Sequence, residues 1–186
     1  SGSYYSSLAD LESSEGIDAD GNGTIGFSAD SLTPFTVVED DGNGGTITRP
    51  VYSDGVTLAT DGEGSSASLY LIDSGVVSRV QDYWGSGLSL GSLDYSWSSS
   101  WTDWWSNDTV NYESGQSIEA LIEKQDGGYV LVLENFTQYE YSTQTQYNSD
   151  YGYYYTYDIS SAGAVDWWSG SYYSSLADLE SSEGID

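Results

Sequence analysis

Oxygen-bearing side chains recur at every second position near the start of the chain, a spacing typical of calcium loops. The donors are Asp18, Asp20, Asn22 and Thr24. Side-chain oxygens at positions 1, 3 and 5, a carbonyl at 7, a glycine at 6 and an aliphatic residue at 8 form the first two-thirds of an EF-hand loop. A hard cation requires six to eight oxygens, and this spacing wraps several of them around one point. Residues 18–26 therefore predict a Ca²⁺ site.

The loop departs from an EF-hand at its last coordinating position. An EF-hand places a bidentate Glu at position 12, where this chain has Ala29. The missing ligand is Asp30, or a carboxylate of the preceding helix such as Glu12 or Glu15, or water. Incomplete coordination predicts a weak affinity, about 10⁻⁴ to 10⁻³ M. The alternative interpretation is a Gly- and Asn-rich turn that binds no metal.

A short helix is expected directly before this loop, over residues 5–16. Ser6 or Ser7 can cap its first turn, and Gly16 ends it. Leu11 lies on its apolar face, and acidic residues occupy its early positions, where the helix dipole favours negative charge. The helix would lead straight into the first calcium ligand.

The same segment occurs twice in the chain. Residues 169–186 repeat residues 1–18 letter for letter. A fixed period indicates a tandem array, and a unit of this length can hold its own core. We therefore assign residues 1–26 to a junction helix and calcium loop, 27–168 to a β-rich repeat domain, and 169–186 to the start of the next identical repeat. An artificial duplication, or a short motif used twice within one domain, is the alternative.

The chain is strongly acidic. Thirty acidic residues and three basic ones give a formal net charge of −27, and Cys, Met and His are absent. Such self-repulsion opposes a compact state unless counter-ions neutralise it, so Ca²⁺ is the natural partner. Nucleic acids and anionic membranes are excluded because binding them depends on Lys and Arg. No membrane-spanning segment or signal peptide is visible. We expect an extracellular, secreted or cell-surface location, where calcium is plentiful.

After residue 27 the sequence changes to short β-rich runs separated by Gly, Asp, Asn and Ser. The expected strand pairs are 35–39 with 46–51, 56–60 with 68–72, 117–124 with 129–134, and 138–147 with 151–159. Residues 76–83 and 164–168 are expected to be further strands. Turn residues typical of hairpins lie between the two strands of a pair. The pattern predicts a mainly β, antiparallel sandwich or barrel-like domain with one short helix and an EF-hand-like calcium loop.

Tyrosines alternate along the last predicted strand pair. They are Tyr139, Tyr141 and Tyr147 on one strand, and Tyr151, Tyr153, Tyr155 and Tyr157 on the other. Alternation places each set on one face of its strand. That face is either a core face or an exposed platform for glycans or a neighbouring chain. Residues 97–105 hold tryptophans at helical spacing but with serines between them, which predicts a short helix or an irregular aromatic loop. The candidate contact residues are Tyr151, Tyr153, Tyr155, Trp104 and Trp105.

A strand of the type Tyr-Val-Leu, a Tyr- and Trp-rich strand, a Leu-Glu helix and an Asp/Gly loop follow one another from residue 128 through the duplicated segment. This order resembles the tryptophan-rich tandem repeats of secreted bacterial surface proteins, especially cyanobacterial ones. The resemblance implies an extracellular protein with calcium-supported repeats and no enzymatic activity. It covers about 60 residues of the unit and does not reach residues 30–127.

Three functions compete on these grounds. We expect a structural tandem-repeat unit of an extracellular, calcium-stabilised filament or cell-surface adhesin fibre, whose partners are identical repeats of the same or neighbouring chains. A carbohydrate-binding module with exposed Tyr and Trp rings is the alternative. A glycoside hydrolase is disfavoured, because it needs a defined pair of carboxylates and no pair stands out. No catalytic residue is therefore assigned.

Overall fold

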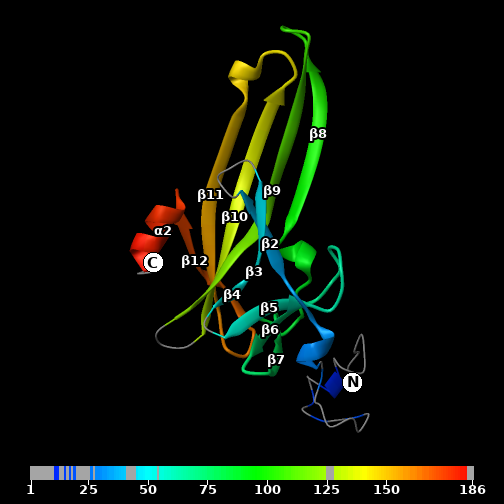
Figure 1. Cartoon of the computed structure of the whole chain (residues 1–186), viewed down its shortest axis with the longest axis vertical. Coiled ribbons are helices and arrows are strands. Elements are labelled where there is room, and N and C mark those ends of the chain that lie inside the picture. Colours follow the sequence, from blue (N-terminus) through cyan, green and yellow to red (C-terminus); the bar gives the residue numbers. More distant parts are fainter. Residues whose placement is uncertain are drawn as a thin grey trace.

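The chain folds into antiparallel β-sheets, with a short α-helix near its C-terminal end (Figure 1). The computed structural model describes residues 11, 12, 15, 17, 19, 26, 28–40, 45–53, 55–124 and 128–183. Strands dominate this part of the chain, which confirms the prediction of a mainly β, antiparallel fold with a short helix. Leu11, Glu12 and Glu15 are helical, as expected for the first copy of the duplicated segment.

The larger sheet is a five-stranded antiparallel meander. Its strands are β8 (Tyr95–Asp103), β9 (Asp108–Glu123), β10 (Tyr129–Tyr141), β11 (Ser149–Ile159) and β12 (Val165–Tyr173), each paired with the next. The central strand β10 pairs with β9 along its whole length and with β11 over most of it. The predicted hairpin before β10 is present, since Tyr129 pairs with Glu123 and the Lys124 N–H donates to the Gly128 carbonyl at 3.1 Å.

The smaller sheet packs beside one end of the larger one. Its strands are β1 (Thr33–Pro34), β4 (Tyr52–Ser53), β5 (Val56–Thr60), β6 (Leu69–Asp73) and β7 (Val76–Arg79). The order is β1-β5-β6-β7, and β4 also pairs with β5. A separate hairpin joins β2 (Thr36–Asp40) to β3 (Thr46–Pro50). Two of the predicted strand pairs, β2–β3 and β5–β6, are thus confirmed.

One core cluster draws residues from both sheets. The smaller sheet and its flank contribute Val56, Leu58, Leu69, Leu71 and Val80, and the larger sheet contributes Ile118, Leu121, Tyr129, Leu131, Leu133 and Ile159. Alternation on β10 sends Tyr129, Leu131 and Leu133 to this face. Burying each such aliphatic side chain is worth about 1.5–3 kcal/mol. We call the smaller sheet, together with the part of the larger sheet that shares this core, the base of the molecule. The shared core holds the larger sheet in place.

Beyond the core, strands β8 to β11 continue as a long blade, which we define as residues 95–116 and 134–153 (Figure 1). The pairing Gly115↔Phe136↔Gly152 crosses the blade near its root. A Cβ at Gly115 would lie 2.3 Å from the Tyr95 carbonyl oxygen, so a side chain there would push β8 away. Glycine at this position keeps β8 close to β9.

The tip of the blade is tied together by one carboxylate. Asp108 at the start of β9 accepts hydrogen bonds from the Ser142 hydroxyl, the Thr143 N–H at 3.0 Å and the Gln144 N–H at 2.8 Å. The Ser142 N–H also donates to the Thr109 carbonyl at 2.9 Å. These bonds hold the segment after β10 against the β8–β9 turn. They also lower the pKa of Asp108 from 3.8 to about 2, with the Ser142 bond as the largest cause.

The second copy of the duplicated segment is part of this fold. Strand β12 continues across position 168 and ends at Tyr173, and helix α2 (Leu176–Glu183) follows. The Ser175 hydroxyl caps the helix by accepting from the Asp178 N–H at 3.1 Å. Leu179 is 2% exposed and packs on Val130 and Val132, on the face of β10 opposite the main core. No helix in the described part of the chain is long and apolar enough to cross a membrane.

Two expectations for the aromatic strands were wrong. Residues 95–103 form strand β8 rather than a helix or an irregular loop, because a spacing of four also returns to the same face of a strand. The predicted strand 138–147 does not exist as one element. Its first residues belong to β10, which runs on unbroken from Tyr129 to Tyr141, and residues 145–147 form the 3₁₀ turn η3.

The Asp108 carboxylate should stabilise the blade tip only while it is ionised. Replacing it by Ala removes all of its bonds, so Asp108→Ala should destabilise the tip at neutral pH and change the fluorescence of the neighbouring Trp104 and Trp105. Because the folded-state pKa is lowered to about 2, this loss should be complete above pH 3.8 and disappear as the pH falls towards 2. Thermal and acid unfolding of both proteins would measure it. Ser100→Ala, an exposed substitution on the blade that removes no titratable group, is the control.

Candidate functional site

The predicted calcium ligands are described only in part. Asp18, Asp20, Asn22 and Thr24 lie outside the described residues, so the site stays a prediction. Glu15 lies on the helix before the loop and Asp30 in the 3₁₀ turn η1 (Ala29–Ser31) after it, and both are exposed. Within the described ranges, no group of three or more carboxylates is placed to hold a metal ion.

Glu12 is the described residue that reaches this loop. Its side chain is 1% exposed, and its two carboxylate oxygens accept from the Ala19 N–H at 2.9 Å and the Gly26 N–H at 3.1 Å. Ala19 and Gly26 lie at the two ends of the predicted loop, so Glu12 joins these ends through backbone bonds. Sequence reasoning considered Glu12 as a metal ligand and missed this anchoring contact, which no local spacing rule indicates.

The blade carries a continuous aromatic face. The residues are Tyr95, Trp97 and Trp101 on β8, Tyr112 on β9, Tyr139 and Tyr141 on β10, Tyr151 and Tyr153 on β11, and Tyr172 on β12. Strand pairing places them on one side, because directly opposed residues point the same way, as in Tyr112↔Tyr139. We call this set the aromatic face. It continues the core face of the same strands.

Neighbouring rings on this face contact one another. The ring centroids of Trp97 and Tyr112 are 4.8 Å apart, those of Tyr112 and Tyr139 are 4.9 Å apart, and those of Tyr153 and Tyr172 are 5.1 Å apart. Tilted and edge contacts at such distances contribute about 0.5–1.5 kcal/mol beyond burial. The rings therefore stabilise the blade, which no second sheet covers within the described part of the chain.

Much of the aromatic face is open to solvent. Tyr151 is 64% exposed and Trp97 54% exposed, whereas Tyr155 is half-buried next to the core. Trp104 and Trp105 lie at the tip, with ring centroids 3.9 Å apart, and are more exposed still. The five predicted contact residues thus fall into two exposed groups and one residue at the edge of the core. The sequence indicated the tyrosine alternation but missed Trp97, Trp101 and Tyr112, whose strand periodicity had a helical interpretation.

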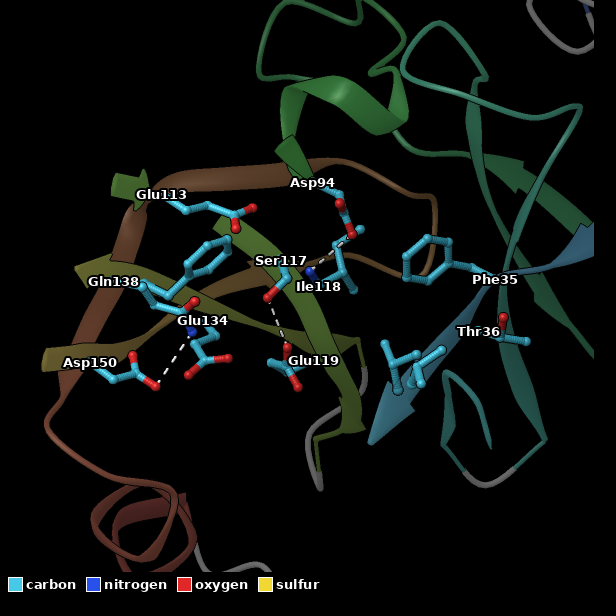
Figure 2. Close-up of a pocket in the computed structure, with 13 residues that line it drawn as sticks. Phe35, Thr36, Asp94, Glu113, Ser117, Ile118, Glu119, Glu134, Gln138 and Asp150 are labelled. Atoms are coloured by element: carbon cyan, nitrogen blue, oxygen red, sulfur yellow. Dashed lines mark hydrogen bonds between the residues drawn. The ribbon is translucent and has the colours of Figure 1, made fainter. Parts of the chain in front are cut away.

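The other face of the blade is acidic near its root. A hollow of about 550 Å³ opens there between the larger sheet and strand β2, and Figure 2 shows its lining. Its acidic residues are Asp94, Glu113, Glu119, Glu134 and Asp150. Side chains within it bond to one another, with Ser117 donating to Glu119 at 2.9 Å and Gln138 donating to Asp150 at 3.4 Å. We call this feature the acidic hollow.

Two carboxyl groups of the acidic hollow have raised pKa values. Burial raises the pKa of Glu134, and the nearby charges of Glu119 and Asp150 raise it further. Burial also raises the pKa of Asp94, although a bond from the Ile118 N–H opposes that rise. Arg49 approaches the hollow from β3, where it donates to the Glu119 carbonyl at 3.3 Å. Carboxylates in this state favour a proton or a cation over an anionic ligand.

The basic residues all lie at the base of the molecule. Arg49 is on β3, Arg79 on β7, and Lys124 directly after β9. The Lys124 ammonium is 2.8 Å from the Asp158 carboxylate, and Arg79 donates to the Ser68 hydroxyl at 3.3 Å. The blade itself contains no Lys or Arg. Its two faces therefore offer stacking rings and carboxylates respectively.

No protein-family model, curated protein or solved structure matches the chain. The features that bear on function are the exposed rings of the blade and the docked helix of the duplicated segment.

Glu134→Gln should stabilise the protein at neutral pH. The pKa of Glu134 in the folded state is above the usual 4.5, so the native state holds this proton more tightly than the unfolded state. The wild type therefore loses stability as the pH rises from 4.5 through the raised pKa. Removing the charge should raise the unfolding free energy at pH 7, by an amount that solvent screening keeps small. Denaturant unfolding at pH 7 and pH 4 would measure this. The gain should vanish at pH 4, and Glu63→Gln, in an exposed loop, should give none.

Proposed function

We propose that the chain is a structural tandem-repeat unit of an extracellular, calcium-stabilised filament or adhesin fibre, of the kind that its resemblance to tryptophan-rich repeats implies. The proposal gives the chain no catalytic role. Copies of the same unit, in the same chain or in neighbouring chains, would be its partners. The shared core of the two sheets supports a sandwich-like unit that is stable enough to serve as one element of an array.

The observation that carries this proposal is the place of the duplicated segment. Residues 169–183 form the end of β12 and helix α2, and Leu179 closes a second apolar cluster on Val130 and Val132. Residues 1–15 have the same sequence, so they would complete a preceding unit in the same way. Each boundary would then consist of a docked helix followed directly by the next unit's loop, with no flexible linker between them.

Calcium has a physical role in such an array. A net charge of −27 per chain opposes close packing of units. A divalent ion bound in residues 18–26 would neutralise carboxylates directly after the junction helix. Glu12 supports this arrangement because it already holds both ends of the loop against the helix. The ion would stiffen the boundary, and a string of domains would become a rod.

Calcium should stabilise the protein modestly and specifically. With a dissociation constant of about 1 mM, about 10 mM Ca²⁺ should add about 1.4 kcal/mol to the free energy of unfolding. Thermal melts in Ca²⁺, in Mg²⁺ and in chelator would show it. Asp20→Ala should abolish the Ca²⁺ response, whereas Asp61→Ala, in another acidic Gly-rich loop, should retain it. Equal melting temperatures in Ca²⁺ and chelator would refute the calcium role.

The aromatic face supports a second candidate function, glycan binding. Exposed rings on one face of a sheet can stack on sugar rings, and the negative charge restricts the ligand to neutral or cationic polysaccharides. This function is compatible with an adhesin fibre, since each unit would present one blade. The rings of Trp97, Trp101 and Tyr151 would carry the contact.

Ring removal on the blade should weaken binding to neutral polysaccharides. Trp97→Ala and Tyr151→Ala should each reduce affinity about two- to tenfold, as expected for one lost stacking contact. Pull-down on insoluble neutral glycans and affinity electrophoresis would measure this. Trp84→Ala is a matched control, because Trp84 is exposed in a turn of the base. Binding that depends equally on Trp84 would contradict a blade site.

A further inference from the structure

The two copies of the duplicated helix bury different residues against different parts of the molecule. In the second copy, Leu179 is buried on the sheet while its neighbour Glu180 is exposed. In the first copy, the equivalent Glu12 is buried against the following loop, whereas the equivalent Leu11 is only half-buried. One sequence therefore shows two contacts, a leucine contact to a preceding sheet and a glutamate contact to a following loop.

The sheet surface under α2 must fit either copy. Val130 and Val132 receive Leu179, and the Asp158 N–H donates to the Ser169 hydroxyl at 2.8 Å. Tyr173 pairs with Tyr154 in the last part of β12. Every residue that makes these contacts in residues 169–183 has an identical counterpart in residues 1–15. The surface therefore cannot distinguish its own C-terminal segment from the N-terminal segment of another chain.

We propose that this surface is an interaction site whose partner is the N-terminal segment of a second copy of the same chain. Residues 1–15 of one chain replace residues 169–183 on the sheet of another, so Leu11 docks on the partner's Val130 and Val132. The exchanged helix then makes both contacts at once, because Glu12 still holds its own loop. The contact joins two different surfaces, so it propagates head to tail unless its rotation closes a ring.

The intramolecular state is favoured at low concentration. The segment α2 is tethered beside its surface at an effective concentration on the order of millimolar, and both states bury the same leucine. Wild-type protein should therefore be monomeric when dilute. Weakening the C-terminal copy alone removes this advantage and leaves the surface to the N-terminal copy of a neighbour. This exchange rests on the duplication and the docking contact, and it does not require the proposed array or calcium.

The decisive comparison uses the two equivalent leucines in the full chain. Leu179→Asp should produce oligomers whose apparent mass rises with concentration in analytical ultracentrifugation, while Leu11→Asp and the wild type stay monomeric. The double variant Leu11→Asp/Leu179→Asp exposes the same apolar surface but has no intact donor, so it should not assemble. If the double variant assembles like Leu179→Asp, or if Leu179→Asp stays monomeric, the exchange is overturned.

A cross-linking experiment covers the case in which Leu179→Asp does not fold. The chain has no cysteine, so introduced thiols report only on each other. With Leu179→Ala added to both acceptor proteins to loosen α2 from the sheet, Leu11→Cys should form a mixed disulfide with Val132→Cys at least on the order of ten times faster than with Ser98→Cys, where Ser98 is exposed on the blade. Equal rates would overturn the proposal. Loss of the calcium response in the melts above would leave this result unchanged, so the two proposals fail separately.

Discussion

The pairing of β10 with β9 and β11 is the constraint on which the rest of the molecule depends. This one strand has an alternating pattern that never breaks, so the side that faces the core at Leu131 and Leu133 is the side that carries Tyr139 and Tyr141 further on. The base supplies hydrophobic burial for the first half only. The second half is held by ladder hydrogen bonds, by ring contacts and by the Asp108 bonds at the tip. The aromatic surface is exposed because strand β10 is longer than the core that covers its first half.

The opposite side of the same strand follows the same logic with different chemistry. Near the base, Val130 and Val132 need cover and receive Leu179 from helix α2. Further along, Glu134 and Gln138 take their place, and the sheet face becomes acidic. Because α2 is short and is anchored by a single buried leucine, its attachment is a small apolar contact. A small, local and duplicated contact is the kind that can be exchanged between chains.

Sequence reasoning identified the fold class because β-rich runs, turn residues and alternation are local signals. It found the hairpins around β2–β3, β5–β6 and β9–β10, and it placed Tyr151 and Tyr153 on one face. It failed at Trp97 and Trp101, because a spacing of four suits a strand as well as a helix. Alternation of tyrosines shows that they share one face of a strand, but it does not show whether other elements cover that face. The exposure of the aromatic face therefore could not be predicted from the sequence. The role of Glu12 depends on contacts across the loop, which spacing does not encode, and the calcium ligands stay a prediction.

The confinement of Arg49, Arg79 and Lys124 to the base makes the blade a purely negative rod. Two blades brought side by side would repel each other over the screening distance of about 8 Å at physiological ionic strength, with no basic side chain to bridge them. In any assembly of these units, electrostatic repulsion would keep neighbouring blades apart. The distance between blades would decrease as salt or divalent ions accumulate between them. The same repulsion that opposes close packing would keep the rings of neighbouring units from collapsing on one another.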